Sequence, residues 1–71
     1  MIPYDVCYII YKTVDLDTTY FIGYTDLGRA TFSSHKCNSK KFMSYKEVSD
    51  EVDKVRSSTG DYCCIGFKLV R

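Results

Sequence analysis

The sequence contains no stretch that approaches the roughly twenty consecutive apolar residues of a membrane-spanning helix. It also has no strong excess of either charge, with a formal net charge of +1. A charge so close to zero argues against recruitment to nucleic acid or to a membrane surface by the overall field, so any electrostatic targeting has to be local. The N-terminal residues lack the basic segment that precedes the apolar run of a secretory signal. We therefore expect a protein of the reducing cytoplasm, with no membrane partner.

Several catalytic and metal-binding patterns are also missing. The single histidine, His35, has no acidic residue between Leu27 and Lys46 to orient it, which argues against nucleophilic catalysis. The four glycines are scattered and form no phosphate-binding loop. The four cysteines include no C-x-x-C pair, and Cys63 and Cys64 would point to opposite faces of a strand. We expect no enzymatic activity, no cofactor and no metal site, and we interpret the cysteines as buried thiols.

What the sequence does contain is enough apolar material for one small folded domain. Its 71 residues are 45% hydrophobic and include seven tyrosines and four phenylalanines. This composition is too rich in core-forming residues for a disordered chain. A chain of this length lies near the lower size limit for a single apolar core. We therefore predict a single domain over residues 1–71.

Residues 6–14, 20–25 and 29–35 are predicted to form three strands. The first segment is rich in β-branched and aromatic residues without helical spacing, and the second forms a hairpin with it. Gly23 inside the second strand indicates a bulge or a close packing contact. Alternation in the third segment favours a strand, but the pattern leaves strand and helix open for residues 30–35.

The clearest local signal is a helix start at Ser44. Glu47, three residues later, completes a capping box, and Met43 and Val48 are placed to form a hydrophobic staple. Gly60 is a typical C-terminal stop. Between these ends, apolar residues recur at helical spacing along one stripe. The stripe consists of Tyr45, Val48, Val52 and Val55.

The alternating residues of the segment 61–71 predict a final strand. One face of this strand would carry Cys63, Ile65, Phe67 and Leu69. A helix between two strands of one sheet normally makes a right-handed crossover, so we expect the final strand to lie parallel to an earlier one. The predicted fold class is α+β: a small mixed sheet of three or four strands with one helix packed on one face, in the order β-β-(β)-α-β.

One helix covers only one face of such a sheet. The first, second and last predicted strands nevertheless carry tyrosine, isoleucine or cysteine on both faces. Two alternatives follow for the second face. It is either an open apolar surface that binds a partner or a second copy of the chain, or it is covered by loops.

A segment without acidic residues predicts a locally positive edge. Its basic side chains are Arg29, Lys36, Lys40, Lys41 and Lys46. Such an edge either contacts phosphate or an acidic protein surface, or is a solvated loop. With the histidine of the same segment included, the candidate partner-binding residues are Arg29, His35, Lys36, Lys40 and Lys41.

Residues 9–11 (IIY) and 21–23 (FIG), followed by Arg29 and His35, resemble the front half of a GIY-YIG nuclease domain. The family places an arginine, and often a histidine, after its second motif strand. Isoleucine stands here for the first glycine and phenylalanine for the second tyrosine of the motif. The 71 residues also supply no counterpart of the family's metal-binding glutamate. The resemblance implies a catalytically degenerate relative that binds nucleic acid.

A wider resemblance covers most of the chain. The segments YFIGY (20–24), KKFMSYKEV (40–48) and YCCIGFKLV (62–70) are similar to those of small bacteriophage accessory proteins. The resemblance implies a non-enzymatic protein that binds a host protein or complex stoichiometrically and thereby inhibits or redirects host defence or nucleic-acid machinery. Nucleic acid bound through the basic segment is the alternative. A structural homodimer joined through the open sheet face is a third reading.

Overall fold

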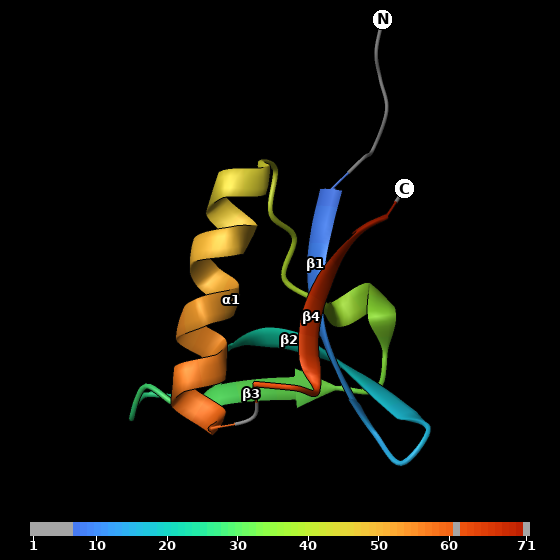
Figure 1. Cartoon of the computed structure of the whole chain (residues 1–71), viewed down its shortest axis with the longest axis vertical. Coiled ribbons are helices and arrows are strands. Elements are labelled where there is room, and N and C mark those ends of the chain that lie inside the picture. Colours follow the sequence, from blue (N-terminus) through green and yellow to red (C-terminus); the bar gives the residue numbers. More distant parts are fainter. Residues whose placement is uncertain (1–6, 61, 71) are drawn as a thin grey trace, which may run out of the picture.

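The computed structural model describes residues 7–60 and 62–70. Its elements are β1 (Cys7–Val14), β2 (Asp17–Tyr24), β3 (Ala30–Ser33), the 3-10 helix η1 (Lys36–Asn38), α1 (Tyr45–Thr59) and β4 (Ile65–Val70), as Figure 1 shows. The four strands form one sheet in the order β3-β2-β1-β4, and α1 packs on one face of it. This confirms the predicted α+β class and the order of elements. The predicted strand residues Val6, Asp61 and Arg71 lie outside the described residues.

The last strand runs antiparallel to β1, with Tyr8 opposite Leu69, so the prediction of a parallel strand and a mixed sheet is wrong. The reason lies in the connection after β3. It returns to the start of β1, where Phe42 donates to and accepts from Tyr8 at 2.9 and 2.8 Å. From there α1 runs alongside β1 in the same direction, and the strand after it has to run back (Figure 1). The crossover rule governs only connections between parallel strands.

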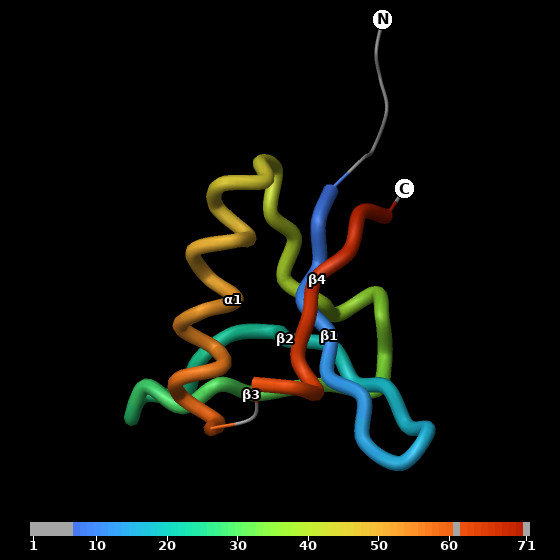
Figure 2. The backbone as a smooth tube through the Cα atoms, viewed as in Figure 1, coloured from blue at the N-terminus to red at the C-terminus, as the bar shows by residue number. Residues whose placement is uncertain are grey.

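The connection also separates β1 from the second half of β2. The two strands pair from their hairpin turn only as far as Tyr11 and Tyr20. Beyond that point the segment before α1 lies against β2, and the Lys40 N–H donates to the Phe21 carbonyl at 2.9 Å. The predicted irregularity at Gly23 is confirmed, because the register with β3 shifts there and its φ is 151°. As Figure 2 shows, β2 and β3 cross the direction of β1 and β4.

The core lies between α1 and the sheet. Its buried side chains are Ile10, Phe21, Phe42, Val48, Val52, Val55 and Ile65. α1 is capped as predicted, because Ser44 Oγ accepts the Glu47 N–H at 3.1 Å and Gly60 ends the helix with a φ of 78°. Of the predicted apolar stripe, the three valines are buried but Tyr45 is 63% exposed. Met43 is 73% exposed, so a staple at this position buries little.

Three strand boundaries differ from the predicted ones. β2 begins at Asp17, earlier than predicted, because the hairpin turn needs only Asp15 and Leu16, with φ of 49° and 74°. β3 ends at Ser33, and η1 follows, so the strand alternative holds for the first part of the segment 30–35. β4 begins at Ile65, which leaves Cys63 exposed before the strand.

The face of the sheet opposite α1 is partly covered. Figure 1 shows η1 on the other side of β1 and β4 from α1. Cys7 and Ile9, which point to this second face, are only 8% and 1% exposed. Further along the face, the half-buried Tyr11 and Tyr20 lie opposite each other on neighbouring strands. The chain itself therefore covers the part of the second face around Cys7 and Ile9.

Candidate partner-binding surface

The structure does not bring the candidate basic residues together on one edge. Arg29 precedes β3, whereas His35 and Lys36 follow it, so the strand separates them. In Figure 1 the turn before β3 and η1 lie on opposite sides of the molecule. Arg29, His35, Lys36, Lys40 and Lys41 are all exposed. They are accessible to a partner, but Arg29 lies apart from the others.

The two lysines after η1 contact their own chain. Lys41 Nζ donates to the carbonyl oxygens of Cys37 and Ser39 at 3.5 and 3.2 Å. Lys40 Nζ lies 5.5 Å from the centre of the Phe42 ring, a cation–π contact with a core residue. Part of the basic segment therefore stabilises the connection that leads to α1.

Exposed apolar side chains gather instead around Tyr8. The rings of Tyr8, Tyr45 and Phe67 make three edge-to-face contacts, with centroids 6.1, 6.2 and 5.6 Å apart. Leu69 lies opposite Tyr8 in the β1–β4 pairing and is 53% exposed. Met43 lies in the chain between Phe42, which pairs with Tyr8, and the N-cap Ser44, and its side chain is 73% exposed. These side chains form what we call the aromatic patch: Tyr8, Met43, Tyr45, Phe67 and Leu69.

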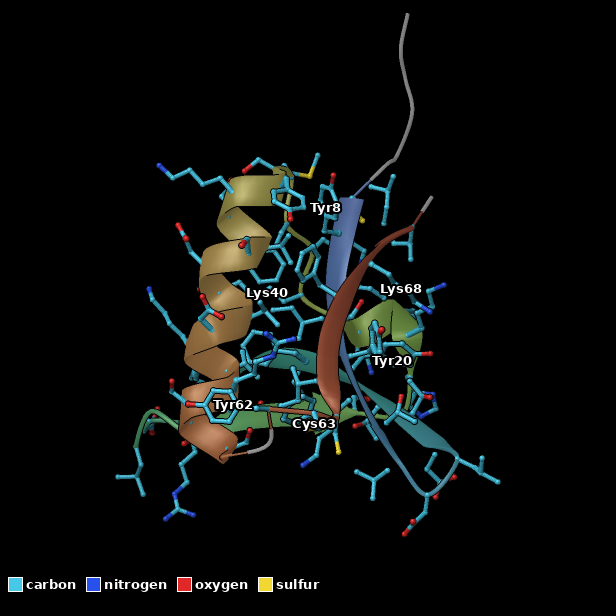
Figure 3. The ribbon with its side chains drawn as sticks, viewed as in Figure 1. Tyr8, Tyr20, Lys40, Tyr62, Cys63 and Lys68 are labelled. Carbon is cyan, nitrogen blue, oxygen red and sulfur yellow. The ribbon has the colours of Figure 1, made fainter. Side chains whose placement is uncertain are left out.

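Three elements position the aromatic patch. Figure 3 shows Tyr8 between the first turn of α1 and β1. The Ser44 cap fixes that first turn, and the turn holds the Tyr45 ring against Phe67 of β4. Sequence patterning assigned Tyr45 to the core stripe and Met43 to a staple, so it missed their exposure. One signal in the sequence pointed to this exposure. Tyr45 is the first residue of the helix, and a residue at a helix end is less covered by the sheet than one in the middle.

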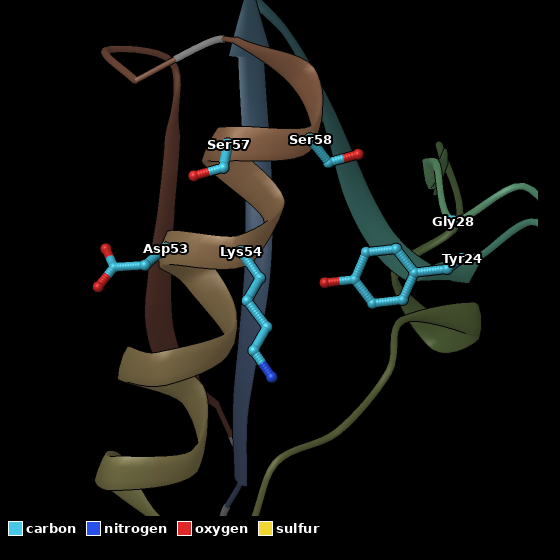
Figure 4. A pocket seen from close by; sticks show the side chains of 6 residues that line it. All are labelled: Tyr24, Gly28, Asp53, Lys54, Ser57 and Ser58. Carbon is cyan, nitrogen blue, oxygen red and sulfur yellow. The ribbon is translucent and has the colours of Figure 1, made fainter.

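An open hollow lies on another side of α1, next to the turn before β3. It has a volume of about 750 Å³ and is open to solvent. Its lining residues, shown in Figure 4, are Tyr24, Gly28, Asp53, Lys54, Ser57 and Ser58. Tyr24 Oη donates to Glu51 Oε2 at 2.6 Å. Burial, this hydrogen bond and the negative charge of Glu51 raise the pKa of Tyr24 above its ordinary value. The neutral phenol thus ties β2 to α1 as a hydrogen-bond donor.

The structure also shows how exposed the cysteines are and whether the described residues contain a metal-binding cluster or a membrane-spanning helix. Cys7 is buried, as expected for a thiol packed as a small hydrophobe, whereas Cys37 and Cys63 are exposed. Within residues 7–60 and 62–70, no three or more His, Cys, Asp or Glu side chains gather closely enough to hold a metal ion. No helix in the described part of the chain is both long enough and apolar enough to span a bilayer.

The chain matches no family model, and no curated protein or solved structure is significantly similar to it. The resemblances to GIY-YIG domains and to phage accessory proteins therefore stay predictions. The structure itself defines a class: a small α+β protein with one helix on an antiparallel sheet and an aromatic patch at one end of their interface.

Proposed function

We propose that this chain is a non-enzymatic binding module of the cytoplasm that acts by stoichiometric contact with a partner protein, which it inhibits or redirects. A host protein is the partner implied by the resemblance to phage accessory proteins. The observation that carries the proposal is the aromatic patch. Three of its apolar side chains are more than half exposed: Met43, Tyr45 and Leu69. Exposed apolar surface that includes tyrosine and methionine is typical of protein interfaces.

Covering the exposed side chains of the patch would contribute to the affinity of a protein contact. Full burial of a large apolar side chain is worth roughly 1.5–3 kcal/mol, so covering the exposed parts of three contributes on the order of 3 kcal/mol. The edge-to-face contacts hold Tyr45 in place before binding, which reduces the entropy lost when a partner orders the surface. The exposed basic residues would add electrostatic steering and specificity.

Nucleic acid, the alternative partner, has one observation in its favour. Tyr11 and Tyr20 lie opposite each other on the second sheet face, and Lys68 Nζ lies 5.5 Å from the centre of the Tyr11 ring. Aromatic rings combined with basic side chains are what single-stranded nucleic acid stacks on. Both tyrosines are only partly exposed, so we favour the protein partner.

The test is affinity capture from a host-cell lysate with three forms of the tagged chain. One is the native chain, the second is a patch variant (Met43→Ser, Tyr45→Ser, Leu69→Ser), and the third is a basic variant (Arg29→Glu, Lys36→Glu, Lys40→Glu, Lys41→Glu). We expect the native chain to capture a protein in stoichiometric amount and the patch variant to lose it. A patch variant that captures the same protein equally well contradicts the proposal.

Two controls separate the alternatives. Capture that disappears on nuclease treatment, together with gel-shift binding that weakens steeply with added salt, would support nucleic acid. The basic variant tests the contribution of the charged residues, and its unchanged capture would exclude them from the interface. A native chain that only captures copies of itself would indicate the homodimer.

A further inference from the structure

The two edges of the sheet differ in how far their backbone groups are blocked. β3, at one edge, has only four residues, and the register of its pairing with β2 shifts at Gly23. The backbone N–H of Ala30 at its start donates to Ser58 Oγ of α1 at 3.2 Å. Short length, irregular register and a capped backbone group are features that protect an edge strand from further pairing.

β4, at the other edge, has six residues and a regular register with β1. The Thr13 N–H donates to the Cys64 carbonyl at 3.0 Å, so the backbone groups of Cys64 face β1. The direction of the backbone N–H and C=O groups alternates along a strand, so the groups of Gly66 and Lys68 also face β1. The residues in between have their N–H and C=O groups on the free side of the strand: Ile65, Phe67 and Leu69.

α1 blocks only the first of these outward residues. Arg56 donates from Nε and Nη2 to the Ile65 carbonyl oxygen at 3.1 and 2.7 Å. Within residues 7–60 and 62–70, the outward backbone groups of Phe67 and Leu69 have no backbone partner. The one charged side chain of β4, Lys68, points to the second face and does not guard the edge. The open part of the edge therefore lies directly beside the aromatic patch.

We propose that the β4 edge at Phe67 and Leu69 binds an extended segment of the partner protein, which joins the sheet as a fifth strand. The proposal rests on the protein-binding function proposed above and specifies how the partner binds. An extended backbone is the structure that offers alternating donors and acceptors to such an edge. Side chains alternate between the two faces of a strand, so every second residue of the segment would lie beside Phe67 and Leu69, on the face that carries Tyr45, and should be apolar.

One of the registers open to a second copy of the chain conflicts with a contact already present at this edge. If two β4 strands paired antiparallel about Phe67, Leu69 of each copy would lie opposite Ile65 of the other. The Ile65 carbonyl is already bound by Arg56, so the pairing would lose either that contact or the new hydrogen bond. A heterologous segment can end before this position.

Amide hydrogen exchange, followed by NMR on the full chain, tests the proposal. The probe is a peptide selected from a display library of random short peptides on the immobilised native chain. In the free chain, the outward amides of Phe67 and Leu69 should exchange faster than the inward amides of Gly66 and Lys68. Bound peptide should slow exchange at Phe67 and Leu69 by about tenfold or more, and the selected peptides should carry apolar residues at alternate positions.

A matched pair of variants tests the hydrogen bonds themselves. Leu69→Ala removes the side chain and keeps the outward N–H, whereas Leu69→Pro removes the N–H as well and is tolerated at an edge position. We expect Leu69→Pro to bind the selected peptide about tenfold more weakly than Leu69→Ala. The spectra of both variants verify that they are folded, and the exchange measurement on the native chain stands without them.

Several results would overturn the proposal. These are the absence of any selected peptide, bound peptide that leaves Phe67 and Leu69 unprotected, and equal binding by the two Leu69 variants. Protection that appears without peptide and increases with chain concentration would assign the edge to a second copy. The capture experiment with the patch variant remains a separate test of protein binding. A failure of the strand-addition proposal can therefore be distinguished from a failure of the proposed protein-binding function.

Discussion

The guanidinium of Arg56 donates two hydrogen bonds to the carbonyl oxygen of Ile65, from Nε at 3.1 Å and from Nη2 at 2.7 Å. The contact joins the C-terminal half of α1 to the first residue of β4. This contact fixes the position of the start of β4 relative to α1. It also occupies the carbonyl of Ile65, the first of the backbone groups that face outward from the β4 edge. The same arginine lies 3.9 Å from Asp53, a weak exposed pair that adds little.

Replacing this arginine should weaken the attachment of β4. We predict that Arg56→Met, which keeps the apolar stem, lowers the free energy of unfolding by about 1–2 kcal/mol, because it removes two charge-assisted hydrogen bonds to a carbonyl. Urea denaturation measures the change. Lys54→Met, at an exposed position of the same helix, is the control and should change stability by less than about 0.5 kcal/mol. Equal effects of the two substitutions would refute the role given to Arg56.

The contribution of the N-cap residue Ser44 to the stability of the chain can be measured in the same way. Ser44→Ala leaves the Glu47 N–H without its acceptor, and we predict a loss of about 1 kcal/mol in the free energy of unfolding. Ser44→Asp keeps an acceptor and should retain most of the stability. If alanine and aspartate gave the same denaturation midpoint, the cap would not be the stabilising feature.

The Tyr24–Glu51 contact predicts a loss of stability at alkaline pH. The pKa of Tyr24 is raised in the folded state by burial and by Glu51, so the unfolded chain ionises first. The stabilisation is complete below about pH 10, the ordinary tyrosine pKa, and is lost as pH rises toward the higher folded value. The measurement is the difference in unfolding free energy between the native chain and Tyr24→Phe, followed from about pH 8 to about pH 12. A difference that stayed constant over this range would show that Tyr24 ionises alike in both states.

Local sequence signals were sufficient to predict the helix and the presence of each strand, although three strand boundaries differ from the predicted ones. The Ser44 cap and the Gly60 stop depend on contacts within a few residues of one another, and the helical spacing of the valines marks the face of α1 that packs on the sheet. All three features were predictable. The irregularity at Gly23 was predictable for the same reason. These features explain why the fold class and the order of elements could be derived without a structure.

Features that depend on the path of the chain could not be derived in this way. The direction of β4 follows from the return of the connection to Tyr8, a contact with Phe42 that no periodicity encodes. The separation of Arg29 from Lys36 follows from the strand between them. The aromatic patch was missed because the helical pattern shows which face Tyr45 shares with the valines but not how far the sheet extends beneath it.

The most direct measurement is a calorimetric titration of the captured and purified partner protein with the native chain and with the patch variant. A third titration uses a control variant with three exposed changes elsewhere on the chain: Leu16→Ser, Leu27→Ser and Tyr62→Ser. We predict a complex of one chain per partner, unaltered affinity for the control, and at least about tenfold weaker binding for the patch variant, because a few buried apolar anchors carry most of an interface's energy. Equal affinity of the native chain and the patch variant would contradict protein binding through the aromatic patch.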